Sequence, residues 1–297
     1  MTADPPSVEA DLLRQRDSAK TAAAPCRYSK MKIDSELVYE VNGLCDFIFL
    51  IHARQDDRQR VTEERLLIDP PFAGRLHVQS ESGNRMFRIQ AQSGQLKLHY
   101  QATVEKRIDP IDTAATQSPI HELPDDMLHF LAPSRYCESD HLGPAALQLF
   151  VDIEPGFLRV QAITDWVRKN ISYRIGSSNA LTTARDVFVQ RAGVCRDLAH
   201  LSVSFCRALN VPARLVAGYS RFPEPPPDFH AVFEAFIGGR WVMFDPTGMC
   251  DPAHVVTIAT GGDAKDVAFA TMFGPAQMLS MRPDVEVLDD GGVPCVK

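Results

Sequence analysis

The segment at residues 191–201, Arg-Ala-Gly-Val-Cys-Arg-Asp-Leu-Ala-His-Leu, places a cysteine at the start of a helical pattern. After the cysteine, apolar residues recur three and four positions apart, at Leu198, Leu201, Phe205 and Leu209. Asn210 and Pro212 end the pattern, so we predict a helix that begins at Cys195. The unpaired N–H groups and the dipole at a helix start favour an anion, and cysteine pKa values fall there from about 8.5 toward roughly 3.5–7.5. For a cysteine taken alone, a small buried apolar side chain is the favoured interpretation, and a reactive thiolate is favoured only where partner residues lie nearby.

A β-hairpin predicted downstream brings a histidine close to an aspartate. Its two strands flank the two-residue turn Gly238-Gly239, and in that register position 230 lies diagonally from position 245. The side chains of His230 and Asp245 are therefore expected within reach of each other. A carboxylate that accepts one ring N–H of a histidine fixes its tautomer and leaves the other nitrogen for a thiol. Together with Cys195, this spacing favours a Cys-His-Asp arrangement.

The residues around these two elements indicate a mixed unit of helices and strands. Periodicity predicts a helix over 156–169, a short helix over 184–191 and a strand over 214–217. Thr183 and Asp186 form a capping-box pattern ahead of the short helix, and Gly193 is expected to close it. Helices followed by an antiparallel sheet are typical of the α+β class.

Residues 32–106 have the pattern of an antiparallel sheet. Short apolar or alternating runs occur at 37–39, 47–51, 65–68, 76–78, 86–89 and 96–100. Turn residues separate these runs at nearly regular intervals, which is typical of a small all-β sandwich. His52, His77 and His99 fall in this pattern, where solvent-facing or core roles are favoured over metal binding.

Composition suggests how the chain is divided. We expect a disordered leader over 1–30, a β-rich domain over 31–110, a linker over 111–145, a catalytic domain over 146–260, and a C-terminal helix and tail over 261–297. A proline-rich loop at 223–227 lies just ahead of His230, where it is well placed to gate the site. That gating role is a hypothesis.

The helix and the hairpin belong to a longer series of motifs. The series comprises Arg191–Leu201, Cys206–Arg214, Val216–Tyr219, Phe229–Ala231, Gly239–Trp241 and Phe244–Thr247. Over roughly residues 155–250 it resembles the bacterial transglutaminase-like superfamily, and the strand-rich half resembles more loosely the N-terminal region of one subgroup. The resemblance implies a papain-like core preceded by an all-β sandwich-like domain, and acyl-transfer chemistry without a metal or an organic cofactor. It also implies that Cys195 is the nucleophile, His230 the general base and acid, and Asp245 the carboxylate that orients the histidine.

The resemblance leaves two features of the site open. Many family members place an aromatic residue after the His-Ala pair, where this chain has Val232, so substrate choice is not determined. No motif fixes the donor to an oxyanion, for which the backbone amide of Cys195 is the physical candidate. The candidate side chains for this role are Trp166, Tyr173 and Gln190.

Polar residues near the motifs have alternative roles. Asp197 lies in the first turn of the helix, where we favour a cap on backbone amides over a catalytic part. Tyr219 ends the strand after the helix and is a candidate substrate-binding residue, with a half-buried strand position as the alternative. Cys250 and His254 form an isolated C-x-x-x-H without a companion pair, so a zinc site has little support.

Charge and cysteine content exclude several classes of protein. The 297-residue chain has 31 basic and 38 acidic residues, and its net charge of -7 offers no attraction for nucleic acid or anionic membranes. Seven cysteines without a C-x-x-C pair predict reduced thiols. No apolar run approaches the ~18 residues of a membrane span, and the N-terminal residues lack the apolar core of a secretory signal. We therefore expect a cytoplasmic protein.

The leading functional hypothesis is a thiol-dependent enzyme that acts on peptide or protein amides through a thioester. Water is the favoured acceptor, which makes it a cysteine peptidase or amidase. Transfer to an amine is the alternative, because both reactions share the first half-reaction. A non-catalytic interaction protein on the same fold is a further alternative. The oligomeric state and the role of the β-rich half stay open.

Overall fold

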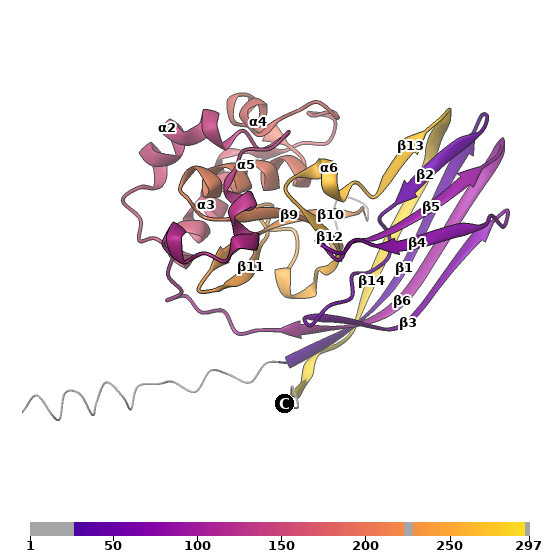
Figure 1. Cartoon of the computed structure of the whole chain (residues 1–297), viewed down its shortest axis with the longest axis horizontal. Coiled ribbons are helices and arrows are strands. Elements are labelled where there is room, and N and C mark those ends of the chain that lie inside the picture. The colour runs from indigo at the N-terminus through magenta and orange to yellow at the C-terminus, as the bar shows by residue number, and fades with distance from the viewer. Residues whose placement is uncertain (1–26, 223–227, 295–297) are drawn as a thin grey trace, which may run out of the picture.

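The computed structural model describes residues 27–222 and 228–294. The leader expected before residue 27 and the proline-rich loop at 223–227 lie outside the described residues, so both stay predictions. Residues 27–30 belong to a strand, which corrects the expected domain start at residue 31. The described chain forms a β-sandwich beside a unit of helices and one antiparallel sheet, as Figure 1 shows.

Eight strands build the sandwich. They are β1 (Arg27–Val41), β2 (Cys45–Phe49), β3 (Gln59–Asp69), β4 (Gly74–Val78), β5 (Arg85–Ala91), β6 (Gly94–Ile108), β13 (Ala270–Phe273) and β14 (Ala276–Pro294). One antiparallel sheet has the order β14-β1-β6-β3 and the other β13-β2-β5-β4. Every second residue of β1 from Met31 to Val41 is buried, and Tyr39 packs on Phe47 of the facing sheet with ring centroids 5.3 Å apart. The predicted all-β sandwich is confirmed.

The helix and tail predicted over 261–297 are wrong for most of that segment. In the part of this segment that the structure describes, residues 261–294, the one helical turn is α6 (Ala264–Val267), and the chain then returns to the sandwich as β13 and β14. Strand β14 pairs with β1, so that Val285 lies opposite Ile33 and Val287 opposite Met31. Its small and acidic composition hid the strand, because the hydrogen-bond partner comes from the other end of the chain. Both ends of the chain therefore build one sandwich.

Helices and short strands make up the second unit. The α-helices are α2 (Ser139–Phe150), α3 (Phe157–Asn170), α4 (Ala184–Gln190) and α5 (Cys195–Ala208). The 3-10 helices are η1 (Ile120–Glu122), η2 (Asp125–Leu131) and η3 (Pro252–His254), and the strands are β7 (Ser172–Tyr173), β8 (Ala192–Gly193), β9 (Ala213–Tyr219), β10 (His230–Ile237), β11 (Arg240–Phe244) and β12 (Val256–Gly261). The main sheet is antiparallel with the order β11-β10-β9-β12. Every residue from Asp197 to Arg207 is buried, because helices and sheet surround α5. The α+β class is confirmed, although α2 begins inside the expected linker.

The local signals for this unit are largely confirmed. The hairpin has the predicted register, with Phe233 opposite Phe244 around Gly238 and Gly239, which both have positive φ. Asp186 accepts a hydrogen bond from the Thr183 amide at 2.9 Å, as a capping box requires. The end of α4 differs, because Arg191 and not Gly193 takes the left-handed conformation there. The Arg191 guanidinium lies over the rings of Phe188 and Trp166, contacts that offset the backbone strain.

The sandwich covers one of the two edges of the main sheet. Strand β12 lies at that edge, and two side-chain amides of the sandwich pair with its backbone. Gln59 accepts from the Thr257 N–H and donates to the Thr257 carbonyl, both at 2.8 Å. Asn84 makes the same pair of bonds to Thr260, at 3.0 and 2.9 Å. The N-terminal domain thereby satisfies backbone groups that a bare edge strand would leave unpaired.

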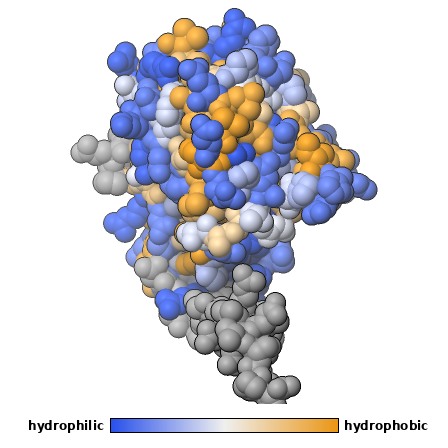
Figure 2. All heavy atoms as spheres, turned by 90° about the vertical axis from the view of Figure 1, so that its left-hand side faces the viewer, coloured by the Kyte–Doolittle hydropathy of each residue, from blue (hydrophilic) through white to orange (hydrophobic). Residues whose placement is uncertain are grey.

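The helical layer leaves some apolar side chains in contact with solvent. Leu147 and Val151 at the end of α2 are each 50% exposed, and Leu158 of α3 is 52% exposed. Apolar atoms gather on the face seen in Figure 2, among hydrophilic ones. Among the described residues, no helix has the length and apolar content needed to cross a bilayer.

Candidate active site

The candidate nucleophile lies where a short parallel strand pair leads into α5. Strand β8 ends at Gly193, and β7 places Tyr173 opposite that residue. Val194 is the N-cap, and the helix begins at Cys195, which is partly exposed. Position 193 requires glycine, because a Cβ there would come within 2.8 Å of the Asp197 Cβ. The predicted start of the helix at Cys195 is confirmed.

Asp197 caps this helix as predicted. Its Oδ2 accepts a hydrogen bond from the Val194 N–H at 2.9 Å, and its side chain is fully buried. Its Oδ1 lies 2.8 Å from the Arg196 guanidinium, which also donates to the Asn179 carbonyl. The turn that carries Cys195 is therefore held by a carboxylate with several partners.

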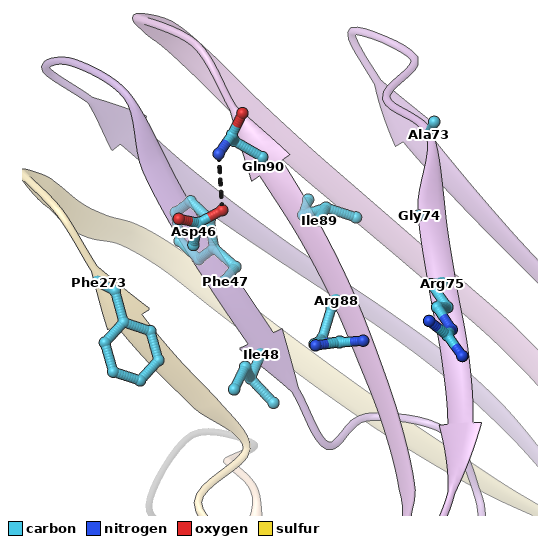
Figure 3. A pocket seen from close by; sticks show the side chains of 10 residues that line it. All are labelled: Asp46, Phe47, Ile48, Ala73, Gly74, Arg75, Arg88, Ile89, Gln90 and Phe273. Carbon is cyan, nitrogen blue, oxygen red and sulfur yellow. Dashed lines mark hydrogen bonds between the residues drawn. The ribbon is translucent and has the colours of Figure 1, made fainter.

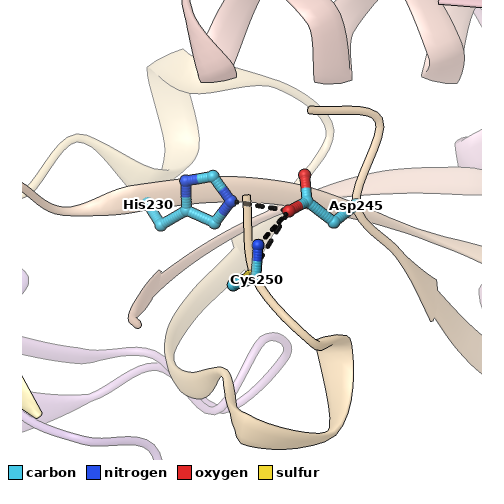
Figure 4. A group of neighbouring side chains, drawn as sticks. All are labelled: His230, Asp245 and Cys250. Carbon is cyan, nitrogen blue, oxygen red and sulfur yellow. Dashed lines mark hydrogen bonds and ion pairs between the residues drawn. The ribbon is translucent and has the colours of Figure 1, made fainter. Parts of the chain in front are cut away.

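His230 and Asp245 meet beside the start of α5. His230 is the first residue of β10, and Asp245 directly follows β11. The His230 Nε2 and Asp245 Oδ2 atoms lie 3.2 Å apart, and each side chain is 1% exposed (Figure 4). The Cys195 side chain also lies close enough to His230 to interact with it. The structure therefore brings together the three residues that the sequence singled out.

A tight turn surrounds the Asp245 carboxylate with donors. The Thr247 amide and hydroxyl donate to Oδ1 at 2.8 and 2.7 Å. The amides of Met249 and Cys250 donate to Oδ2, each at 3.1 Å, and the Cys250 Sγ lies 3.4 Å from the same oxygen (Figure 4). Arg168 of α3 donates to the Asp245 carbonyl at 2.7 Å. These contacts hold the Asp245 carboxylate in the orientation in which it faces His230.

The pairing shifts the pKa values of His230 and Asp245 in opposite directions. Burial alone would lower the pKa of His230, but hydrogen bonds to Asp245, Cys195 and Cys250 and the charge of Cys195 outweigh burial and raise it. Burial alone would raise the pKa of Asp245, but His230 and Thr247 hold it well below its usual range. The pair therefore favours an imidazolium and a carboxylate at neutral pH.

Tyr173 lies beside the candidate nucleophile. Its hydroxyl interacts with both the backbone amide and the thiol of Cys195. Burial, and then the negative charges of Cys195 and Asp228, raise the pKa of Tyr173. The phenol is therefore neutral near pH 7 and able to donate a hydrogen bond.

The other two side chains considered as donors to an oxyanion, those of Trp166 and Gln190, interact with other groups. The Trp166 ring packs edge-on against Phe205, with ring centroids 5.6 Å apart, in the core between the helices. The Gln190 amide donates to the Ala192 carbonyl at 2.8 Å. Of the three side chains considered, the structure therefore brings only Tyr173 to Cys195.

A further carboxyl group lies close to the site. Asp228 precedes the histidine by two residues, and it interacts electrostatically with His230 and Tyr173. Loss of hydration raises the pKa of Asp228, while a hydrogen bond from the Phe229 backbone opposes this effect. Sequence reasoning missed this residue, because no motif includes it.

Tyr219 does not line the site, contrary to the sequence prediction. Its side chain is completely buried, and its hydroxyl donates to the Ile51 carbonyl of the N-terminal domain at 2.6 Å. The ring lies near Tyr100 and Phe229, with centroids 6.3 and 5.2 Å away. The residue ends β9 at the contact between the two domains, which a strand pattern alone does not reveal.

Cys250 is the neighbour of the pair that sequence reasoning missed. In the sequence its nearest histidine is His254, whereas in the structure its thiol lies beside Asp245 and His230. The potential ligand atoms of His230, Asp245 and Cys250 all lie within 4.8 Å of one another, the one such group among the described residues. These are ligand types that zinc uses, but the Asp245 oxygen that would bind a metal already accepts from two backbone amides. The five cysteines in the described chain are free thiols.

A separate hollow lies on the outer face of the sandwich. It has a volume of about 530 Å³ and includes Ile48, Arg75, Arg88 and Phe273 in its lining (Figure 3). Arg75 and Arg88 lie directly opposite each other on β4 and β5. None of the three residues of the candidate site contributes to it.

A central helix that begins at a cysteine, packed on an antiparallel sheet and joined to a β-sandwich, defines a papain-like, transglutaminase-like class of protein. Residues 148–246 match the family model of the transglutaminase-like superfamily. Residues 29–126 match that of the bacterial transglutaminase N-terminal domain. The chain belongs to the transglutaminase-like superfamily and carries this bacterial N-terminal domain, as its sequence motifs predicted.

Solved and curated relatives agree with this membership. A crystal structure of a proposed cysteine protease from Cytophaga hutchinsonii is 40% identical and has a TM-score of 0.85, with 91% of this chain and 94% of that chain covered. An uncharacterised protein of Mycobacterium leprae is 31% identical over 120 residues, which cover 37% of this chain and 42% of the relative. One of Mycobacterium tuberculosis is 29% identical over 136 residues, covering 38% and 43%. The chain thus matches less than half the length of these mycobacterial relatives.

Proposed function

We propose that this protein is a thiol-dependent acyl-transfer enzyme that hydrolyses peptide or protein amides. The observation that carries the proposal is the buried His230–Asp245 pair, whose histidine also meets Cys195 at the start of a helix. A thiol, an imidazole and an orienting carboxylate in this order are the parts that nucleophilic acyl transfer requires. The similarity to a proposed cysteine protease over almost its whole length supports the same class of reaction.

The reaction proceeds in two steps. The Cys195 sulfur attacks the amide carbonyl carbon, and the His230 imidazolium donates its proton to the departing amine, which leaves a thioester. His230 then takes a proton from water, the resulting hydroxide equivalent attacks the thioester, and the Cys195 thiolate departs as the acid is released, which restores the thiolate and the His230 imidazolium. Asp245 keeps the imidazole in one orientation throughout, because backbone amides hold its carboxylate in place.

Two donors are available for the oxyanion of the tetrahedral intermediates. The backbone N–H of Cys195 lies at the helix start, where it has no intrahelical acceptor. The Tyr173 hydroxyl interacts with that amide and with the thiol, so it is close to the reacting atoms. Preorganised donors of this kind stabilise charge that develops in the transition state.

Transfer to an amine is the second candidate reaction, and Asp228 favours it. Its carboxyl group interacts with both His230 and Tyr173, so a negative charge lies beside two residues of the site. A protonated amine would be attracted to this charge before it attacks the thioester. Hydrolysis and amine transfer differ only in this second step.

The first test is the reactivity of Cys195. We expect iodoacetamide to label Cys195 readily at about pH 6 in the wild type, and at least about tenfold more slowly in His230→Ala, because the imidazolium stabilises the attacking sulfur. With 4-nitrophenyl acetate we expect a burst of one nitrophenolate per chain that is absent in Cys195→Ala. Labelling of Cys195 that does not depend on His230, with no burst, would refute the proposal.

The acceptor is tested with the acylated enzyme. Adding cadaverine to the burst reaction distinguishes the two candidates by mass spectrometry of the products. Acetate as the main product supports hydrolysis, and acetylcadaverine that disappears in Asp228→Asn supports amine transfer.

A further inference from the structure

A lysine of the N-terminal domain reaches the turn that surrounds Asp245. Lys106 lies on β6, and its side chain is buried against the second domain. Its Nζ donates to the carbonyl oxygens of Pro252 and Val255, at 2.9 and 2.6 Å. Pro252 is the first residue of η3, and Val255 is the residue that caps its C-terminal end.

The contact is only two residues from the donors that hold the catalytic carboxylate. The amides of Met249 and Cys250 bind Asp245 Oδ2, and Pro252 follows shortly along the chain. The turn is thus fixed at one end by the hairpin strand β11 and at the other by Lys106. Without the ammonium group, the Val255 carbonyl would lose a short hydrogen bond in a buried place.

The charges around Lys106 come from several elements. Glu234 of β10 and Asp251 favour the ammonium form, as does Cys250, whereas Arg58 opposes it. Glu234 itself pairs with Arg58 and with Arg214, at 3.4 and 2.7 Å. Among the described residues no carboxylate forms an ion pair with Lys106, so the two carbonyl groups are its hydrogen-bond partners. Burial lowers the pKa of Lys106 to about 8.

We propose that Lys106 is a positioning residue, through which the N-terminal domain holds the turn at 246–255 and thereby the orientation of Asp245 and His230. This inference rests on the proposed function, because it concerns the same site. It gives the β-sandwich a role in the reaction beyond covering the edge of β12. A displacement of catalytic groups by about 1 Å costs up to roughly 100-fold in rate, so a small loosening of this turn is measurable.

The test compares Lys106→Met with Asn84→Ala in the full chain. Each variant removes two hydrogen bonds from the N-terminal domain to the backbone of the second domain, but those of Asn84 reach Thr260, away from the turn. We expect the acylation rate with 4-nitrophenyl acetate to fall about tenfold or more in Lys106→Met and less than about twofold in Asn84→Ala. In the wild type we expect the rate to decline as the pH rises through about 8, because Lys106 then loses its proton. This decline should be absent in Lys106→Met.

A second readout does not depend on catalysis. We expect the His230 ring N–H that faces Asp245 to give a downfield proton resonance in NMR spectra, which Lys106→Met shifts or broadens and Asn84→Ala leaves unchanged. If Lys106→Met does not fold, Lys106→Gln, which keeps one donor, replaces it. Equal losses of rate in both variants, or an unchanged resonance in Lys106→Met, would overturn the inference. A wild type without any burst would instead refute the proposed function, and the resonance would still decide the role of Lys106.

Discussion

Asp245 shows how a single residue organises the polar groups of the candidate site. Its two oxygens accept from the Thr247 amide and hydroxyl and from the amides of Met249 and Cys250, and one also meets His230. A carboxylate with this many donors stays ionised in a buried place. The negative charge then keeps the histidine protonated, so one side chain determines the charge state of the next.

The charge of the histidine gives a prediction that depends on pH. Because the folded-state pKa of His230 is raised, its stabilising contribution is fully present below the unfolded value near 6.5 and is lost only as the pH rises through the folded value. We expect NMR spectra to show no titration of the His230 ring between about pH 5.5 and 8. In Asp245→Asn the ring should titrate within that range. A wild-type ring that titrates near pH 6.5 would show that the pair does not hold the proton.

Helix α5 shows how an element positions its first residue. Its buried sides fix its direction, and the Asp197 cap fixes the turn at Val194 through which the chain enters it. Apolar spacing predicted this helix and its start, because both are local features. The left-handed residue that ends α4, Arg191, was not predicted, because its cost is offset by ring contacts that sequence spacing does not report.

The Asp197 cap of α5 gives a prediction about the stability of the helix and the reactivity of Cys195. Asp197→Ala should lower the free energy of unfolding by about 0.5–2 kcal/mol and slow the labelling of Cys195, because the turn that carries the thiol loses its anchor. Asp186→Ala is the matched control, since it removes the equivalent cap of α4. Denaturant unfolding and iodoacetamide kinetics measure the two effects. Equal labelling rates in both variants would argue against a link between the cap and the thiol.

At the scale of the whole molecule, the first and the last strand of the described chain pair with each other. Strand β14 pairs with β1, and between them the chain builds the second unit, whose edge strand the sandwich covers. The two domains are therefore not independent in sequence, although the boundaries expected from composition treat them so. The buried Tyr219, whose hydroxyl binds Ile51, belongs to the same contact.

Substitutions in β14 test whether this strand is a packed part of the sandwich. Val285 of β14 is 2% exposed, so Val285→Asp would bury an unpaired charge in the sandwich. We expect a loss of melting temperature of about 10 °C or more, or insoluble protein. Glu286→Ala, on the exposed side of the same strand, should change the melting temperature by less than about 2 °C. Similar melting temperatures for both variants would mean that the segment is a loose tail.

The sequence by itself determined the local features of this protein. The helix that starts at Cys195, the hairpin register that brings His230 to Asp245 and the Asp197 cap follow from spacing over a few residues. The family follows from the resemblance of a series of motifs over roughly residues 155–250. Periodicity and turn chemistry act between neighbours, so they can be recognised without a structure.

Only the tertiary structure decided which distant segments meet. It placed the C-terminal strand in the first sheet, buried Tyr219, brought Tyr173 to Cys195 and Asp228, and joined Lys106 to the turn around Asp245. Each of these contacts joins residues far apart along the chain and depends on backbone groups or buried surfaces that a partner must satisfy. A local pattern shows that a residue needs a partner, but only the fold determines which one it finds.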